Sequence, residues 1–294
     1  MDTKKFLILP NESLKLSKIK TDETLGISSK KDSVKLLENN VDRMRELQSK
    51  LYAQDKYSLL IIFQAMDAAG KDGTIKHVMS GLNPQGTQVF SFKQPSKEEL
   101  DHGYLWRINK ALPERGRIGI FNRSHYEEVL VVRVHDLVKY QKIPDKFNNK
   151  SIWKQRYQQI NDFEKYLYEN GIIIIKFFLH VSKEEQKKRF LKRIEDPSKN
   201  WKFSMGDIEE RKYWDEYQRA YQEAISATTK KHAPWYVIPA DKKWFMRLAV
   251  SEILVKDMKK LKPEFPKLNR EQLSALDEAR KILLNDSELK ERDE

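Results

Sequence analysis

A short segment of small residues around a lysine is the part of the chain best suited to bind phosphate. It follows an apolar run at 58–66 and precedes a helical pattern. Small residues let backbone amides point at an anion, a helix N-terminus contributes its dipole, and a lysine contributes a point charge. We therefore expect Lys71 to be the central cation of a phosphate-binding loop. The residues expected to form this loop are Ala68, Ala69, Gly70, Lys71, Asp72, Gly73 and Thr74.

The loop departs from the common pattern G-x-x-x-x-G-K-[ST] at two positions. Ala65 replaces the first glycine and Asp72 replaces the hydroxyl residue after the lysine, while Thr74 comes later than the pattern requires. Because Mg²⁺ prefers hard oxygen ligands, we expect a carboxylate, that of Asp67 or Asp72, to take the role of the missing hydroxyl. The alternative interpretation is an ordinary turn with a surface lysine.

A second polar segment follows the apolar run at 117–122. A carboxylate at the end of such a strand is the usual second magnesium contact in phosphate-loop enzymes, but this run ends in the neutral Asn122. Glu127 is then the candidate for a second metal carboxylate beside Asp67. Arg123 is suited to stabilise charge on a transferring phosphoryl group. Because loops at the carboxyl ends of parallel strands share one crevice, we expect this segment to lie beside the phosphate loop.

A third segment, 183–202, carries eight basic and four acidic residues. Two of its arginines are four residues apart and therefore on one helical face. A solvated helix face is one explanation, but nucleotide kinases carry a mobile lid with arginines between a strand and a long helix, where this segment lies. We therefore predict a lid at about 183–207. Its expected phosphate contacts are Arg189, Arg193, Lys199 and Lys202.

The three polar segments can form one site only if a sheet brings them to the same edge. The pattern of apolar residues predicts such a sheet. The expected strands are 58–66, 87–92, 117–122, 172–179 and 235–238. The helical patterns between them start near Asp32 and include 97–111, 183–194, 207–232 and 242–260. Strands that are apolar throughout fit a parallel sheet covered on both faces. We predict one α/β domain over 32–262, with an extended N-terminal arm at 1–31 and a charged helical tail at 263–294.

Charge and composition exclude several classes of protein. The 294 residues include 56 Lys and Arg against 44 Asp and Glu, a net charge of +12, which favours polyanionic partners. The absence of cysteine excludes disulfides, thiolate metal sites and cysteine nucleophiles. No HExxH or G-x-S-x-G pattern supports a hydrolase. The apolar runs are too short for a membrane span or a signal peptide, so we expect a cytoplasmic protein without a membrane partner.

Four ordered blocks of the sequence resemble the polyphosphate kinase 2 family. They are AMDAAGKDGT at 65–74, LDHGYLWRINKALPERG at 100–116, FNRSHYEEVLVVRVH at 121–135 and the basic segment at 183–202. The similarity is collinear from about residue 35 to about residue 260. The resemblance implies a P-loop kinase-like fold, with a five-stranded parallel sheet flanked by helices and a helical lid. It also implies reversible, Mg²⁺-dependent transfer of the end phosphate of inorganic polyphosphate to a nucleotide.

The resemblance also assigns roles to individual residues. Asp67 and Lys71 match the essential loop residues, Arg123 matches the arginine after the second strand motif, and Arg133 matches a further phosphate-contacting arginine. Asn122 stands where the diphosphate-specific branch usually has Asp, and FNRSHYE resembles the class III branch, which accepts AMP and ADP. The implied partners are therefore polyphosphate, AMP, ADP and ATP. We expect a homo-oligomer, either a dimer or a tetramer, and no nucleic-acid partner.

Three other functions remain open at this point. One is a polyphosphate kinase that acts only on nucleoside diphosphates, and another is an ATP-dependent nucleoside monophosphate kinase. The third, from a different class, is a basic nucleic-acid-binding protein, although we find no motif that combines aromatic and basic residues for base stacking. A comparison of polyphosphate with ATP as the sole phosphate donor to AMP separates the polyphosphate kinase from the ATP-dependent nucleoside monophosphate kinase.

Overall fold

A six-stranded sheet organises residues 1–285, the part of the chain that this computed structural model describes. The strand order is β1-β6-β5-β2-β4-β3, and every neighbouring pair is parallel except β1 with β6. The strands are β1 (Leu7–Ile8), β2 (Ser58–Gln64), β3 (Thr87–Ser91), β4 (Ile118–Asn122), β5 (Ile172–His180) and β6 (Trp235–Pro239). The α/β class and the five expected strands are confirmed, and the count of five is corrected to six because the N-terminal arm adds β1.

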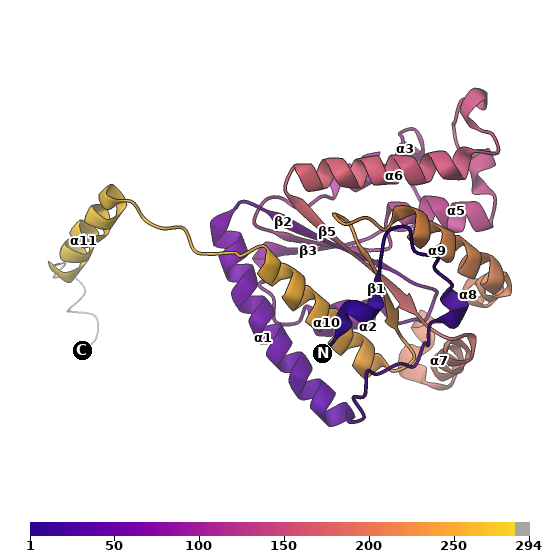
Figure 1. The fold of residues 1–294 in the computed structure, drawn as a ribbon, viewed down its shortest axis with the longest axis horizontal. Coiled ribbons are helices and arrows are strands. Elements are labelled where there is room, and N and C mark those ends of the chain that lie inside the picture. The colour runs from indigo at the N-terminus through magenta and orange to yellow at the C-terminus, as the bar shows by residue number, and fades with distance from the viewer. Residues whose placement is uncertain (286–294) are drawn as a thin grey trace.

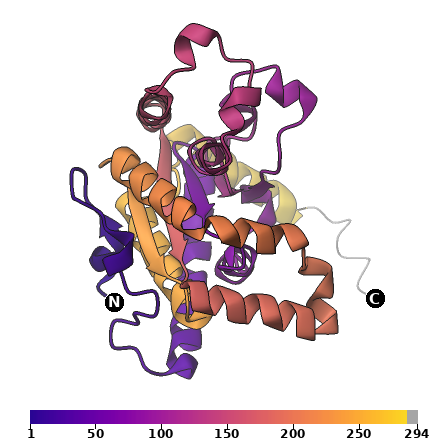
Figure 2. The same cartoon turned by 90° about the vertical axis from the view of Figure 1, so that its right-hand side faces the viewer.

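Helices cover both faces of the sheet (Figure 1). The helices α1, α2 and α10 pack together on one face, and α5, α6 and α9 pack on the other. Figure 2 views the molecule from the side on which α7 and α8 lie. The helices are α1 (Lys30–Gln54), α2 (Lys71–Val78), α3 (Lys97–Leu100), α4 (Trp106–Lys110), α5 (Val131–Val134), α6 (Ile152–Glu169), α7 (Lys183–Glu195), α8 (Met205–Glu210), α9 (Trp214–Thr228), α10 (Lys243–Lys260) and α11 (Arg270–Asn285).

The central strand β2 determines where a site can form. All seven of its residues are buried, as the apolar run at 59–63 predicts for its centre, and β4 and β5 flank it on either side. The chain crosses from β2 to the edge strand β3, returns to β4, and then crosses to β5 on the opposite side. Ligands of such sheets bind at the carboxyl ends of the strands where the order reverses, so the expected crevice lies at the end of β2.

Two expected helices are interrupted. The capping box of Ser96 and Glu99 starts a helix as predicted, but α3 ends at Leu100 and α4 begins only at Trp106. Gly103 lies between them, and glycine has a low helix propensity. The pattern at 207–232 likewise forms α8 and α9 with a short turn between them. The first long helix begins at Lys30 with Ser29 as its cap, two residues earlier than predicted.

The two terminal segments behave differently. The N-terminal arm packs on the core. The ring of Phe6 makes an edge contact with that of Phe245, with 6.0 Å between the ring centroids, and β1 pairs with β6. After α10, residues 262–269 lead to α11, which stands apart from the body (Figure 1). The last part of the predicted tail, 286–294, lies outside the described residues. Across residues 1–285, no helix is long and apolar enough to cross a membrane.

Candidate functional site

A strongly basic cavity of about 620 Å³ lies at the carboxyl ends of β2, β3 and β4. Ten cationic side chains and only two carboxylates line it, so it suits an anion that carries many charges. The cations are Lys71, Lys93, Arg123, Arg189, Lys192, Arg193, Lys199, Lys202, Lys243 and Arg247, and the carboxylates are Asp67 and Asp72. Most residues predicted from the three polar segments therefore meet in one place.

The loop between β2 and α2 shapes one wall of this cavity. Ala68 and Gly70 have φ angles of +59° and +112°, and Gly70 caps α2. Lys71 is buried, and its Nζ donates to the carbonyl of Ala65 at 2.8 Å. Burial lowers the pKa of Lys71, while the neighbouring Asp67 carboxylate opposes this effect. The lysine is thus held across its own loop, with Gly70 and Gly73 beside it at the cavity wall.

Two members of the expected phosphate loop do not line the cavity. Thr74 is fully buried, its hydroxyl donates to the carbonyl of Gly70 at 3.0 Å, and its amide donates to the same carbonyl at 2.9 Å. The amide of Ala69 donates to Met66 at 3.2 Å. The donors of Thr74 and Ala69 are therefore engaged within the loop, and neither residue lines the cavity.

The segment after β4 lies beside the loop, as predicted. Asn122 Nδ2 donates to Asp72 Oδ1 at 2.8 Å, while Asn122 Oδ1 is buried and has no hydrogen-bond partner among the described residues. Arg123 has a φ of +65°, and its guanidinium lies 3.3 Å from Asp67 Oδ1. Burial lowers the pKa of Arg123, but Glu127 and Asp67 outweigh it and the net shift is upward. The two polar segments are therefore joined by Asn122 with Asp72 and by Arg123 with Asp67.

Glu127 faces a smaller cavity of about 230 Å³. Asp67 and Arg123 line both this cavity and the larger one. Burial raises the pKa of Glu127, while Arg123 and Lys71 lower it. Asp67 therefore connects the two cavities, whereas Glu127 does not line the larger one as Asp67 does.

The carboxylates that could hold a metal are few. No group of three potential metal ligands occurs within residues 1–285. Mg²⁺ is typically bound by one or two carboxylates together with substrate phosphates and water. Asp67 and Asp72 both line the larger cavity, and the free Oδ1 of Asn122 lies beside Asp72. This donor set fits a metal ion that is completed by phosphate oxygens.

Arg189 was predicted to contact phosphate, but the structure gives it a different role. Its side chain is only 6% exposed, and all five of its N–H groups donate to protein oxygens. The acceptors are the Glu185 carboxylate and the carbonyls of Ala68, Ala69, Ala240 and Asp241. No donor is left for a phosphate, so Arg189 holds the phosphate loop against the segment before α10.

The other three lid cations line the larger cavity. Arg193 donates to Asp207 Oδ2 at 2.9 Å and so joins α7 to α8. Burial raises the pKa of Asp207, with a smaller contribution from the Asp67 charge. Lys199 pairs with Asp196, and Lys202 lies 4.8 Å from the centre of the Trp201 ring.

Arg133, which was expected to contact phosphate, is held by protein side chains in this structure. It lies on α5 and pairs with Glu223 at 2.6 Å and with the Tyr157 hydroxyl at 2.7 Å. These contacts direct it toward α9 and α6, away from the phosphate loop. It lines neither of the two cavities that contain Asp67.

Sequence reasoning missed four cations of the larger cavity, Lys93, Lys192, Lys243 and Arg247. Lys243 and Arg247 are four residues apart in α10, which begins just after the carboxyl end of β6. That spacing after a predicted strand was the available signal. Burial lowers the pKa of both side chains, and Arg247 Nε has no partner within the described chain.

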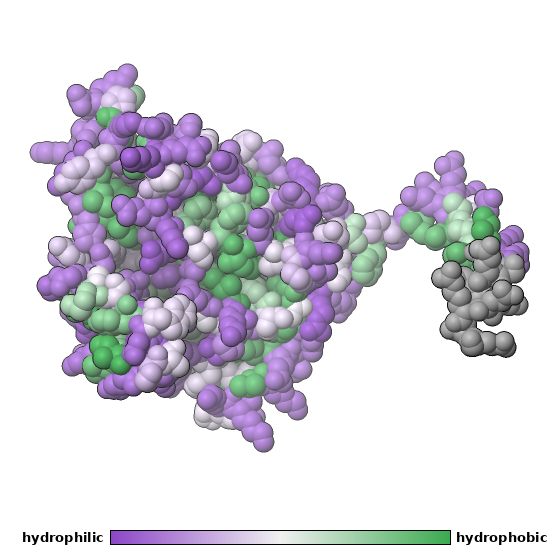
Figure 3. All heavy atoms as spheres, turned by 180° about the vertical axis from the view of Figure 1, so that it is seen from behind, coloured by the Kyte–Doolittle hydropathy of each residue, from purple (hydrophilic) through white to green (hydrophobic). Residues whose placement is uncertain are grey.

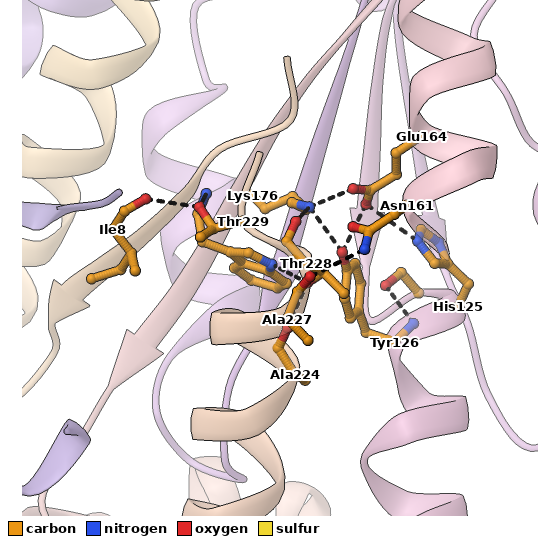
Figure 4. Close-up of polar contacts among 12 residues, drawn as sticks. Ile8, His125, Tyr126, Asn161, Glu164, Lys176, Ala224, Ala227, Thr228 and Thr229 are labelled. Atoms are coloured by element: carbon orange, nitrogen blue, oxygen red, sulfur yellow. Dashed lines mark hydrogen bonds and ion pairs between the residues drawn. The ribbon is translucent and has the colours of Figure 1, made fainter. Parts of the chain in front are cut away.

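A buried polar network lies behind the segment that carries Arg123 (Figure 4). Lys176 Nζ on β5 contacts Glu164 Oε2 at 2.5 Å, the Tyr126 hydroxyl at 2.8 Å and the Thr228 carbonyl at 2.9 Å. The Tyr126 hydroxyl donates to the other oxygen of Glu164 at 2.8 Å. Both ammonium and carboxylate are fully buried. Since Tyr126 is three residues after Arg123, this network anchors the turn that carries the arginine.

The charges of this network are mutually dependent. Burial lowers the pKa of Lys176 to about 8. Burial alone would raise the pKa of Glu164, but Lys176 and His125 outweigh it and the net shift is downward. His125 Nε2 lies 3.5 Å from Glu164 Oε1. Removing any one charge would leave another uncompensated in the core.

Comparisons with known proteins show which family this chain belongs to. The family model described as polyphosphate kinase 2 (PPK2) matches residues 27–266. A protein of Rhodopseudomonas palustris named ADP-polyphosphate phosphotransferase is 50% identical over 96% of this chain and 98% of its own. A protein of Meiothermus ruber named AMP/ADP-polyphosphate phosphotransferase is 44% identical over 90% of this chain and 95% of its own. The crystal structure of polyphosphate kinase 2 from Arthrobacter aurescens has a TM-score of 0.84 at 41% identity, covering 92% of this chain and 94% of that one.

Proposed function

This chain belongs to the polyphosphate kinase 2 family, and we propose that it transfers the terminal phosphate of inorganic polyphosphate, reversibly, to AMP and ADP. It is thus a polyphosphate-dependent nucleotide kinase. The observation that carries this proposal is the cavity with ten cations and two carboxylates at the end of β2. A donor with about one negative charge per phosphate, together with a nucleotide phosphate, matches that excess of positive charge.

The reaction needs no catalytic base. The attacking group is a phosphate oxygen of the nucleotide, which is already anionic. This oxygen forms a bond to the terminal phosphorus of the donor while the bridging P–O bond breaks, so that the donor leaves one phosphate shorter. Catalysis then consists of positioning the two anions in line and stabilising the charge between them.

Lys71 and Arg123 are the proposed catalytic cations. Lys71 Nζ lies over the loop that would hold the transferring phosphoryl group, and Arg123 approaches from the adjacent strand end. Both are held by protein contacts before any substrate binds, Lys71 by the Ala65 carbonyl and Arg123 by Asp67. Such pre-positioned charges stabilise a transition state without further reorganisation. Arg193, Lys199 and Lys202 are proposed to contact donor or nucleotide phosphates when α7 and α8 close over the cavity and exclude water.

We propose Mg²⁺ as the metal, with Asp67 and Asp72 as the residues that would hold it. When bound, the ion would neutralise phosphate charge and orient the reacting oxygens. Glu127 remains a proposed contributor through the smaller cavity, which it shares with Asp67.

Asn122 supports the proposal that both AMP and ADP are acceptors. Its amide donates to Asp72, so an aspartate there would place two carboxylates within hydrogen-bond distance. Two such carboxylates would draw a metal ion or a proton between them. The neutral amide avoids this, and we propose that the acceptor phosphate then sits at either of two depths. The related proteins named for ADP and for AMP with ADP support acceptors of this class.

A donor assay tests the function. Purified protein receives AMP, ADP or GMP with either polyphosphate or ATP as the sole donor, and nucleotides are separated over time. With AMP and polyphosphate we expect ADP first and ATP after a lag. Phosphorylation of AMP from ATP but not from polyphosphate would refute the proposal, and a reaction that stops at ADP would refute the second acceptor alone.

Two variants complete the assay. Lys71→Ala removes the central cation, and we expect the rate to fall on the order of 10²–10³-fold. Lys165→Ala is the matched control, because Lys165 is an exposed lysine on α6 that pairs only with the exposed Glu169. Equal losses in both variants would show that the effect does not come from the cavity.

A further inference from the structure

The N-terminal arm reaches the segments that hold the larger cavity together, although none of its residues 1–29 lines that cavity. In Figure 1 the arm runs from β1 towards the α7 side of the molecule before it enters α1 at Lys30. On that side it makes a polar contact through Thr21, which is half-buried. The arm thus contacts the protein next to the cavity without contacting the cavity itself.

Asp241, in the turn between β6 and α10, makes this contact with the arm. The Thr21 hydroxyl donates to Asp241 Oδ2 at 2.7 Å, and the Asp241 amide donates to the Thr21 carbonyl at 3.0 Å. The other carboxylate oxygen, Oδ1, accepts from the Ser182 amide at 2.8 Å. The Asp241 carbonyl accepts from Arg189 at 3.0 Å. One residue therefore joins the arm, the start of α7 and the arginine that holds the phosphate loop.

The hydrogen bond from Ser182 replaces part of the usual helix cap. Ser182 caps α7, and its hydroxyl accepts from the Glu185 amide at 3.1 Å. In a complete capping box the glutamate at that position would accept from the Ser182 amide in return. Here Glu185 accepts from Arg189 Nε at 2.8 Å instead, so the Ser182 amide depends on Asp241. The start of α7 is therefore fixed from outside the helix, by the residue that contacts the arm.

The helix α7 holds the phosphate loop and carries cations of the larger cavity. Gln186 Nε2 donates to the Asp67 carbonyl at 2.9 Å, and Arg189 donates to two further carbonyls of the loop. Gln186 and Arg189 are both buried. Lys192 and Arg193 follow in the same helix and line the cavity. A displacement at the start of α7 would therefore move the phosphate loop and the lid cations together.

From these contacts we propose that the N-terminal arm positions the phosphate loop and the start of the lid, with Thr21 and Asp241 as the positioning residues. The Thr21 hydroxyl holds the Asp241 carboxylate in the orientation in which its other oxygen accepts from Ser182. A hydrogen bond to an ionised acceptor is stronger than one between neutral groups. This role rests on the proposed function, because it concerns how that site is held, and neither residue contacts substrate in it.

Hydrogen exchange tests the coupling without turnover. Thr21→Val removes the hydroxyl and keeps the shape of the side chain, and exchange is followed by mass spectrometry in the purified full chain. We expect peptides that cover 182–186 and 66–71 to exchange about threefold to tenfold faster, the range that the loss of one hydrogen bond gives. Thr21→Ser retains the hydroxyl and should restore the exchange of the unmodified chain.

Two controls accompany this measurement. Thr24→Val is the matched substitution, because Thr24 lies in the same arm and its amide and carbonyl, but not its hydroxyl, make hydrogen bonds within residues 1–285. Helix α11 is the internal reference, since all of its residues are exposed and it stands clear of the body in Figure 3. Unchanged exchange at 182–186 and 66–71 in Thr21→Val would overturn the proposal, and so would an equal increase in Thr24→Val or an increase throughout the protein.

Kinetic constants show whether the coupling positions the reacting groups. Asp241→Ala should lower kcat for transfer from polyphosphate more than Thr21→Val does, because it also leaves the Ser182 amide without its acceptor. Asp241→Asn should retain most of the activity, since its side chain offers an acceptor to Ser182 and a donor to the Thr21 hydroxyl. Equal losses of kcat in Asp241→Ala and Asp241→Asn would refute the positioning role, and so would a lower unfolding midpoint in Thr21→Val with kcat unchanged. An unmodified chain without turnover on polyphosphate would refute the proposed function, while the exchange measurement would still decide the coupling.

Discussion

Replacing Arg189 by lysine separates a positioning role from a phosphate contact. Arg189 joins the carbonyls of Ala68 and Ala69 to those of Ala240 and Asp241, through donors that diverge from one planar group. A lysine keeps the charge but carries its three donors on one nitrogen, so it can serve only one of the two segments. At least two hydrogen bonds to a charged donor are then lost.

The size of the effect follows from that count. Hydrogen bonds to charged groups contribute about 1.5–3 kcal/mol each, so Arg189→Lys should lower the free energy of unfolding by roughly 3–6 kcal/mol. For a chain of this size the midpoint of thermal unfolding falls by about 2 °C per kcal/mol. We therefore expect the midpoint to drop by roughly 6–12 °C, measured by calorimetry or circular dichroism. The turnover number should fall as well, because the phosphate loop loses its support.

Lys192→Ala is the matched comparison. Lys192 also lies on α7 and lines the same cavity, but its side chain is exposed. It should raise the KM for polyphosphate and leave the unfolding midpoint unchanged. If Arg189→Lys instead left the midpoint unchanged and raised only the KM for polyphosphate, Arg189 would contact the donor and the positioning role would be wrong.

Three further changes test the remaining parts of the site. Asp67→Asn should raise the magnesium concentration needed for half-maximal activity, and an unchanged magnesium titration would transfer the metal role to Asp72. Asn122→Asp should depress the AMP step more than the ADP step in a time course of nucleotides, and equal effects would contradict the two-depth proposal. Lys176→Met should cost about 3–5 kcal/mol of unfolding free energy, since it leaves Glu164 buried without its partner, while Lys176→Met/Glu164→Leu should recover most of it in urea titrations. Because the pKa of Glu164 is lowered in the folded state, its contribution is complete above the usual glutamate range and is lost as pH falls through the folded pKa. The double variant should therefore lose less stability than the unmodified chain on acidification below about pH 4.5.

The parts of the site that depend on local sequence were predictable. The phosphate loop and its lysine follow from small residues between a buried strand and a helix. The meeting of Asn122 and Arg123 with this loop follows from the rule that parallel strands end at one edge. The sixth strand was missed because β1 has two residues and pairs with a strand more than 220 residues away, which no local pattern reveals.

The contacts that local sequence does not reveal are those of side chains whose partners come from distant parts of the chain. A sequence shows Arg189 as one cation on a basic helix, but five protein acceptors use all of its donors. Arg133 comes shortly after the polar segment that follows β4, but its guanidinium contacts Glu223 and Tyr157, which belong to other helices. Lys176 is the single charged residue within an apolar strand of a buried sheet. Such a charge requires a buried partner, so the sequence does indicate a buried ion pair at this position.

The pairing of β1 with β6 has a consequence for how the protein is made. Leu7 pairs with Tyr236, so β1 cannot form its strand pairing until β6 has been synthesised. At about 5–20 residues per second, roughly 10 to 50 seconds separate the synthesis of the two partners. During that time the growing sheet has an open edge, and an open strand edge is a template for pairing with other chains. Nascent chains stalled between β5 and β6 should therefore be the aggregation-prone species, and a bulky tag fused at Met1, whose amino group lies 3.7 Å from Glu252, should prolong that exposure.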